Sequence, residues 1–132
     1  MENRFLCRGK RIDNSEWVQG YLYGIWERRY ILWGMTNDIP DMVEVDPSTI
    51  CRCIGRTDRD KKLIFEHDVI AYLDTYSTES GYAEADCTGE VVWDEETLSF
   101  QVTNRLSAES WEVLAECSVI GNAIDNPELL EV

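Results

Sequence analysis

Few side chains of this chain could do chemistry, and its single histidine comes first among them. His67 is followed directly by Asp68. In a Ser-His-Asp triad the aspartate orients the imidazole, but neighbouring residues on a strand point to opposite faces. One histidine also leaves no second imidazole for a two-histidine metal site within the chain. We therefore expect His67 to lie in a solvent-exposed turn without a catalytic role.

The cysteines are the next candidates for a site. Cys51 and Cys53 alternate on one expected strand, so their thiols would share a face. A structural zinc site needs about four ligands and usually contains a CxxC knuckle. The other ligands would have to come from separate parts of the chain, namely Cys7, Cys87, Cys117 and His67. We expect small, buried, apolar cysteines instead, with no metal and no other cofactor.

Two groups of acidic residues also resemble parts of sites. Asp58-x-Asp60 could begin a calcium loop, but such a loop needs a further oxygen ligand and then glycine, and Lys61-Lys62 follow here. The acidic run 94–96 could supply an acid and a base, yet a solvated hairpin tip explains it better. The chain has no P-loop, GxGxxG or GxSxG motif. We predict no catalytic, cofactor-binding or metal-binding residues and no enzymatic activity; a hydrolase of unrecognised type is the least favoured function.

Aromatic residues are concentrated near cationic ones in the first third of the chain. The aromatic residues are Trp17, Tyr21, Tyr23, Trp26, Tyr30 and Trp33, and the cations are Arg8, Lys10, Arg11, Arg28 and Arg29. Such a set could form a stacking surface for single-stranded nucleic acid. Because the chain as a whole carries a net charge of −14, we favour core packing and cross-strand pairing of these rings.

The negative charge belongs to one half of the chain. Residues 1–67 hold 11 Lys and Arg and 11 Asp and Glu, whereas residues 68–132 hold one Arg and 15 Asp and Glu. This half would repel duplex nucleic acid, whose binding depends on cations. Solubility is the favoured reason for the acidity. An acidic face that docks a basic partner, or that mimics nucleic acid, is the alternative.

The elements that must position these residues are mostly short strands. About eight strands are predicted from runs of β-branched and aromatic residues between turns that contain Gly, Asp or Asn. Residues 17–33 are expected to form a hairpin, residues 34–41 and 74–86 loops, and residues 49–54 a strand that Gly55 ends. Short helices are expected at 110–116, where the spacing also fits a strand, and as one turn at 126–130.

The expected fold class is therefore mainly β with minor helix, in one domain over residues 1–132. The charge pattern suggests two lobes, a neutral, aromatic-rich one at 1–67 and an acidic one at 68–132. The strand, loop and hairpin between residues 68 and 103 are similar to part of a small SH3-like barrel. No apolar run reaches the roughly 20 residues that a membrane span needs. Without an apolar leader, and with an odd number of cysteines, we expect a cytoplasmic protein in a host cell.

Five segments in order resemble the YopX family of small phage and prophage proteins. They are Trp17-Val-Gln-Gly-Tyr, Val45-Asp-Pro-Ser-Thr, the stretch from Ile54-Gly-Arg-Thr to Glu66-His-Asp-Val69, Gly89-Glu-Val-Val-Trp-Asp, and Val119-Ile-Gly-Asn-Ala-Ile-Asp-Asn-Pro-Glu-Leu-Leu130. The family pattern usually has Tyr-x-Gly-Asp where this chain has Phe65-Glu-His-Asp68, so His67 stands at a common glycine position. The resemblance implies a phage-type origin and a two-lobed β fold, and it brings no catalytic residues.

Two classes of function remain open. The first is a phage-encoded, non-enzymatic interaction or assembly protein that binds a protein partner or itself. The second is a nucleic-acid-related role, either as a weak single-strand binder through the aromatic and basic N-terminal region or as an acidic mimic.

Overall fold

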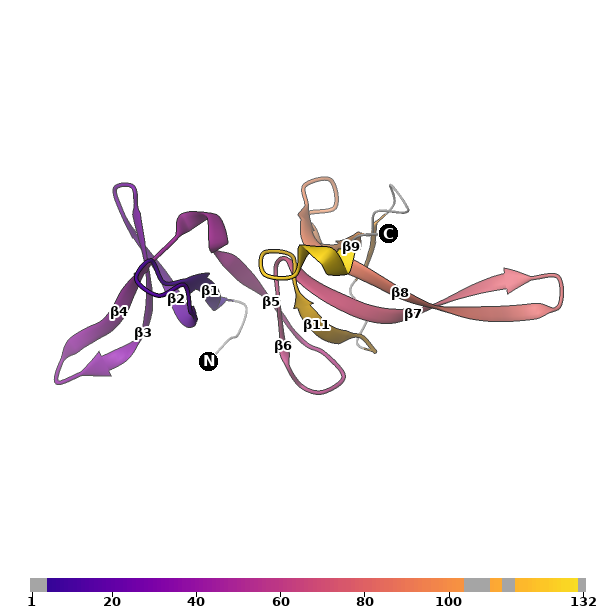
Figure 1. Cartoon of the computed structure of the whole chain (residues 1–132), viewed down its shortest axis with the longest axis horizontal. Helices are drawn as coiled ribbons and strands as arrows, with labels where there is room; N and C mark the ends of the chain where they lie inside the picture. Colours follow the sequence, from indigo (N-terminus) through magenta and orange to yellow (C-terminus); the bar gives the residue numbers. More distant parts are fainter. Residues whose placement is uncertain (1–4, 104–109, 113–115, 131–132) are drawn as a thin grey trace. The chain divides into compact units, whose positions relative to one another are not determined.

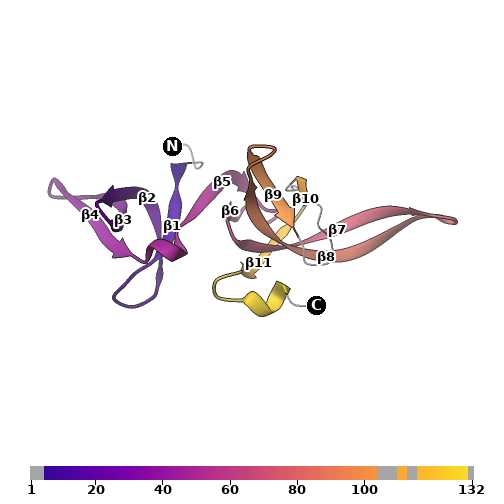
Figure 2. The ribbon, with the colours of Figure 1, turned by 90° about the horizontal axis from the view of Figure 1, so that it is seen from above.

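The computed structural model describes residues 5–103, 110–112 and 116–130 of the chain. They form 11 strands in two antiparallel sheets, and two short 3-10 turns are the only named helical elements among them. The strands are β1 Cys7–Lys10, β2 Trp17–Ile25, β3 Arg28–Thr36, β4 Ile39–Val45, β5 Cys51–Thr57, β6 Leu63–Phe65, β7 Asp68–Thr78, β8 Gly81–Asp94, β9 Ser99–Thr103, β10 Ser110–Glu112 and β11 Ser118–Asn122; the 3-10 turns are η2 Pro47–Thr49 and η3 Pro127–Leu130. The expectation of a mainly β fold is confirmed (Figures 1 and 2).

The chain separates into two compact units, Met1–Gly55 (unit 1) and Arg56–Val132 (unit 2). The structural boundary lies within β5, whereas the charge balance changes after residue 67. The first sheet has the order β4-β3-β2-β1-β5-β6, and the second has the order β10-β9-β8-β7-β11. Within the described residues, no helix has the length and hydropathy that crossing a bilayer requires.

Unit 1 is a meander of antiparallel strands. The expected hairpin at 17–33 is confirmed, with β2 and β3 paired from Tyr21↔Leu32 to Ile25↔Arg28. The expected loop at 34–41 is wrong, because β3 and β4 continue to a two-residue turn at Asn37 and Asp38. Both turn residues have positive φ, 52° and 64°. Asn and Asp tolerate this conformation, and a turn of this kind follows the twist of a hairpin.

The core of unit 1 is small. Cys7, Ile31 and Val45 are buried together, and Val18, Val43 and Ile50 pack against them. Gly20 lies opposite Cys7, and a Cβ built on it would be 2.3 Å from the carbonyl oxygen of Leu32. Only glycine therefore lets β2 approach β3 this closely.

The strand that was expected to stop at Gly55 continues through it. Gly55 has a φ of 84°, and β5 extends to Thr57. A glycine in this left-handed conformation bends a strand without ending it. After β5, the reversal at residues 58–62 leads into the short strand β6, as expected.

Unit 2 is built on the long hairpin of β7 and β8. The two strands pair from Val69↔Glu90 to Thr78↔Gly81, so the loop expected at 74–86 is instead a two-stranded ribbon (Figure 1). Residues 77–82, around the turn of this ribbon, are exposed, so this stretch needs no large aliphatic residues. β9 pairs with β8 only over Glu90–Asp94, and β11 pairs with β7 only over Asp68–Ala71.

Two further expectations for unit 2 are wrong. The second sheet is open, with β10 and β11 as its outer strands, so the suggested barrel does not close in the described residues. The helix expected at 110–116 is a strand at Ser110–Glu112, where Trp111 pairs with Val102; residues 113–115 lie outside the described residues. The run was too short for its helical spacing to outweigh pairing with β9. The single turn expected at 126–130 is present as η3 (Figure 2).

Candidate functional site

His67 lies in the turn where it was expected, but it has specific partners there. Its φ is 69°, its backbone N–H donates to the carbonyl of Val91 at 2.7 Å, and its carbonyl accepts from Ala123 N–H at 2.7 Å. Nδ1 of the imidazole lies 2.8 Å from Oε2 of Glu90. The side chain is thus half-buried against an acidic strand residue rather than fully exposed, and its role is to join the β6–β7 turn to β8.

Asp68 does not orient the histidine. Its side chain is buried, and its Oδ2 accepts a hydrogen bond from the backbone N–H of Phe65 at 2.8 Å. The carboxylate therefore closes the turn between β6 and β7, while the imidazole is directed to Glu90. As predicted from the sequence, the side chains of His67 and Asp68 point in different directions. Asp68 therefore does not act as the orienting carboxylate of a triad with His67.

The Asp58 carboxylate accepts three hydrogen bonds from backbone N–H groups. Its Oδ1 accepts from the backbone N–H groups of Asp60 and Lys62, both at 2.9 Å, and its Oδ2 accepts from that of Val119 at 2.9 Å. Burial alone would raise its pKa, but these backbone donors outweigh burial and hold the pKa below its ordinary value. The Asp58-x-Asp60 pair is a structural tie between the β5–β6 turn and β11, and its buried carboxylate is already satisfied.

The cysteines are dispersed. Cys7, Cys51, Cys53 and Cys117 are buried, Cys87 is half-buried, and none forms a disulfide. Burial raises the pKa of the Cys117 thiol, and the nearby Asp58 carboxylate adds to this effect. Among the described residues, no group of three or more His, Cys, Asp or Glu side chains is placed to hold a metal ion. The absence of a metal stays a prediction for the whole chain.

The acidic run 94–96 lies at the β8–β9 turn. Oδ1 of Asp94 accepts from the backbone N–H of Glu96 at 2.9 Å, and the side chains of Glu95 and Glu96 are exposed. A carboxylate that caps its own turn is the usual use of Asp at such a position. The geometry agrees with the solvated hairpin tip expected from the sequence.

One face of the unit 1 sheet is open and carries mostly apolar side chains, with Arg28 beside Ile25 and Glu44 beside Tyr30. The register places Tyr21, Leu32 and Met42 side by side across β2, β3 and β4, and places Tyr23 beside Tyr30. Exposed fractions on this face are high: Tyr23 48%, Ile25 41%, Met35 63% and Met42 43%. We call this set the open face; its residues are Tyr21, Tyr23, Ile25, Tyr30, Leu32, Met35 and Met42.

The open face corrects the expectation that the aromatic residues form the core. The opposite face carries the buried residues Ile31 and Val45, so the rings lie on the outer side. Cross-strand pairing is confirmed for Tyr23 and Tyr30, whose ring centroids are 6.2 Å apart. Trp26 is at the β2–β3 turn with φ 53° and is 91% exposed. Alternation of Tyr21, Tyr23 and Ile25 along β2 was the available sequence signal for a one-sided face.

Cations border the open face. Arg8 and Lys10 lie opposite Gln19 and Trp17 on the same side of β1 and β2. The guanidinium carbon of Arg8 is 4.8 Å, and Nζ of Lys10 is 5.4 Å, from the Trp17 ring centroid. Both distances are typical of cation–π contacts.

Three further cations of the predicted stacking surface are held locally. Arg11 pairs with Asp13 at 2.8 Å, and Arg29 donates to the carbonyl oxygens of Trp26 and Arg28 at 2.9 Å. A hydrogen bond with Tyr30 raises the pKa of Arg28, and the charge of Glu44 adds to it. Arg28 therefore remains cationic at the edge of the open face.

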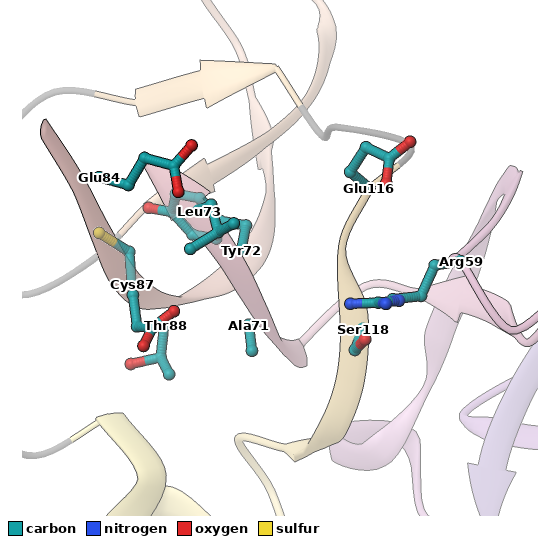
Figure 3. Close-up of a pocket in the computed structure, with 10 residues that line it drawn as sticks. Arg59, Ala71, Tyr72, Leu73, Glu84, Cys87, Thr88, Glu116 and Ser118 are labelled. Carbon is teal, nitrogen blue, oxygen red and sulfur yellow. The ribbon is translucent and has the colours of Figure 1, made fainter. Parts of the chain in front are cut away.

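Unit 2 contains a groove of about 620 Å³ beside the start of the ribbon. Figure 3 shows Arg59, Glu116 and Ser118 on one side and residues of β7 and β8 on the other. Its lining residues are Arg59, Ala71, Tyr72, Leu73, Glu84, Asp86, Cys87, Thr88, Glu116 and Ser118. The sequence did not predict this groove, because its residues come from four separate segments and the ribbon was expected to be a loop.

Comparison with models of protein families identifies the family of this chain. The family model described as YopX protein covers residues 8–131. The chain belongs to the YopX family. The resemblance drawn from five sequence segments is thereby confirmed, and the family is phage-associated and of unknown function. No curated protein matches this YopX chain. Because the family has no known function, the roles of the open face and of the unit 2 groove are inferred from their geometry.

Proposed function

We propose that this YopX-family chain is a phage-encoded, non-enzymatic interaction protein that binds a partner protein on the open face of unit 1. The exposure of Tyr23, Ile25, Met35 and Met42 on one side of a single sheet carries the proposal. Contiguous exposed apolar side chains on a soluble protein mark interaction sites. Tyrosine and methionine are also enriched in protein interfaces.

The chemistry of the open face favours a protein over a nucleic acid. Exposed aliphatic and thioether side chains gain by burial against apolar surface, and a phosphate backbone offers none. The cations at the border, Arg8 and Lys10, already contact the Trp17 ring. The proposed partner is a host-cell or phage protein with an apolar patch, met in the cytoplasm; a second copy of the chain fits the same description.

Capture from host lysate tests the proposal. The bait variant Tyr23→Ser/Met42→Ser removes two exposed side chains of the open face. The control Ile12→Ser/Leu98→Ser removes two exposed apolar side chains from turns elsewhere in the chain. We expect the first variant to weaken retention of a captured protein by about tenfold or more, as loss of central apolar contacts does. Equal retention by both variants would refute the proposal.

Self-association is measured on the same variants by light scattering after gel filtration. If the second copy is the partner, the unaltered chain elutes as an oligomer and the open-face variant as a monomer. A monomer in both cases assigns the open face to a different protein.

Single-stranded nucleic acid binding is the second candidate. The observation that favours it is the placement of Trp17, Tyr21, Tyr23 and Tyr30 on one face together with Arg8 and Lys10. Stacked bases and a cationic border are the two parts of such a site. Oligothymidylate binding at about 0.15 M salt, followed by fluorescence anisotropy, tests it. If the unaltered chain binds oligothymidylate and the Tyr23→Ser/Met42→Ser variant does not, the ligand of the open face is nucleic acid rather than protein.

A further inference from the structure

Among the described residues, no strand pairs with the outer edge of β7 from Leu73 to Thr78. β11 pairs with β7 from Asn122↔Asp68 to Ser118↔Ala71 and goes no further. From Leu73 to Thr78, β8 is the only strand of the described residues that pairs with β7. A strand edge presents alternating N–H and C=O groups that can pair with another extended chain.

The groove of unit 2 begins where β11 leaves β7. Cys117, just before β11, bonds to a different segment: its carbonyl accepts a hydrogen bond from the backbone N–H of Arg59 at 2.9 Å. The groove of about 620 Å³ lies at this departure, lined by Ala71, Leu73 and Ser118 among others (Figure 3). Leu73 is 53% exposed there. An added strand in line with β11 would therefore find both a strand edge and space for side chains.

The charge of this region selects the partner. Between Leu73 and Thr88 the sequence has four carboxylates and no Lys, Arg or His. Asp86 lies opposite Leu73, and Glu84 lies opposite Thr75, so these two exposed carboxylates share a face with Leu73. Unit 2 as a whole has 18 Asp and Glu against 5 Lys and Arg.

These charges argue against two other occupants. A second copy would bring the same carboxylates to the same edge, and like charges across a strand pair are unfavourable. A nucleic acid would be repelled because its binding depends on cations that displace counterions. An extended basic peptide has both the backbone groups and the charge that complement this edge.

We propose that the outer edge of β7, with the groove beside Ser118, binds an extended basic segment of another protein as an added antiparallel strand. Main-chain hydrogen bonds to the strand edge supply affinity in this mode, and side-chain contacts supply specificity. Lysine or arginine side chains of the segment lay their aliphatic stems on Leu73 and direct their charges to Asp86 and Glu84. The site is separate from the open face of unit 1, so either can fail without the other.

A capped octapeptide of alternating lysine and valine is the probe, added to the full chain and followed by NMR. We expect binding in the range of about 0.1–1 mM, with backbone amide shifts from Leu73 to Thr78 and in Ser118. The same peptide with N-methylated valine amides loses strand pairing on one edge and keeps all its charges. It should bind at least about tenfold more weakly. Equal binding of both peptides, or no binding of the first, would overturn the proposal.

Charge variants test the assignment to the groove. Glu84→Lys/Asp86→Lys should weaken binding of the lysine peptide by about tenfold and allow binding of its glutamate counterpart. Glu95→Lys/Glu96→Lys makes the same change in net charge at the β8–β9 turn, away from the groove. An equal loss in this control would mean that only overall charge attracts the peptide, which contradicts a site on β7. All four side chains are exposed, so both variants should keep the fold.

Discussion

Single residues of this chain act mainly as ties between distant segments. Asp58 holds Val119, which is 61 positions away, through a hydrogen bond from backbone N–H to Oδ2. His67 joins its turn to Val91 through the backbone and to Glu90 through Nδ1. We therefore expect substitutions at Asp58 and His67, which resembled metal-binding and catalytic candidates in the sequence, to change unfolding rather than binding.

Asp58→Asn should lower the free energy of unfolding by roughly 1–3 kcal/mol, because a buried network of backbone donors loses a charged acceptor. The side-chain NH2 group of the new asparagine would replace one of the two acceptor oxygens, and it would face a backbone N–H whose hydrogen bond Asp58 now accepts. Asp60→Asn, an exposed neighbour, is the control and should change stability by less than about 0.5 kcal/mol. Urea denaturation of both variants measures the difference. Equal stability of the two variants would contradict the role given to Asp58.

The same carboxylate should contribute to a pH dependence. Its folded pKa lies below the unfolded value, so its stabilising effect is present above the unfolded pKa and disappears as pH falls through the folded pKa. The difference in unfolding free energy between the unaltered chain and Asp58→Asn should thus be largest near neutral pH and shrink below about pH 4. Denaturation midpoints across this range test it, and a difference that grows on acidification would count against it.

At His67 the backbone conformation, with φ 69°, is the main constraint. His67→Val should be less stable than His67→Gly by about 1–2 kcal/mol, because a β-branched residue is strained in this region and glycine is not. The glycine variant relieves strain but loses the contact with Glu90, so it should stay close to the unaltered chain. Thermal unfolding of the three proteins distinguishes the outcomes, and a valine variant as stable as the glycine variant would disprove the constraint.

The strands of unit 1 are held close together by glycine. Gly20→Ala should lower stability by roughly 1–3 kcal/mol, because the new Cβ would meet the Leu32 carbonyl oxygen at 2.3 Å. Gly34→Ala is the matched control in β3, since its Cβ would have Asp41 Oδ2 at 3.9 Å as its nearest neighbour. Chemical denaturation should show little change, or a small gain, for the control. If both substitutions lower the free energy of unfolding equally, the close packing of β2 on β3 does not explain the loss at Gly20.

The elements differ in how far their sequences predict them. Strands with β-branched and aromatic residues, such as β2 and β9, were predicted because their side chains carry the signal. The ribbon of β7 and β8 was missed because ladder hydrogen bonds hold its strands together, and its exposed residues 77–82 carry no apolar pattern. Trp111 illustrates the opposite error, since helical spacing over seven residues could not compete with pairing to Val102.

The candidate site was still harder to predict. The tie between Asp58 and Val119 depends on a contact across 61 positions, which no local pattern contains. The open face could have been inferred from alternation along β2, but its extent depends on the pairing of β3 with β4, and residues 34–41 of these strands were expected to form a loop. The groove needs four separate segments to meet, and the sequence identified only the acidic charge of this part of the chain.

For the molecule as a whole, the uneven charge is the dominant property. Unit 2 has a net charge of −13 from its Asp, Glu, Lys and Arg residues. Self-repulsion of this kind destabilises a compact state. Raising the ionic strength from about 0.01 M to 0.1 M shortens the Debye length from about 30 to 10 Å and should raise the melting temperature. Calorimetry measures the shift; a fall with added salt would show that attractive pairs outweigh the repulsion.

The hydrogen bond between Asp58 and Val119 also has a consequence for synthesis on the ribosome. Every strand pair of unit 1 lies within its first 55 residues, and these become available early in translation. The tie in unit 2 forms only after Val119 has left the exit tunnel. N-terminal units fold first during synthesis when their contacts are local. Unit 1 is thus able to expose its open face while the acidic unit is still being made.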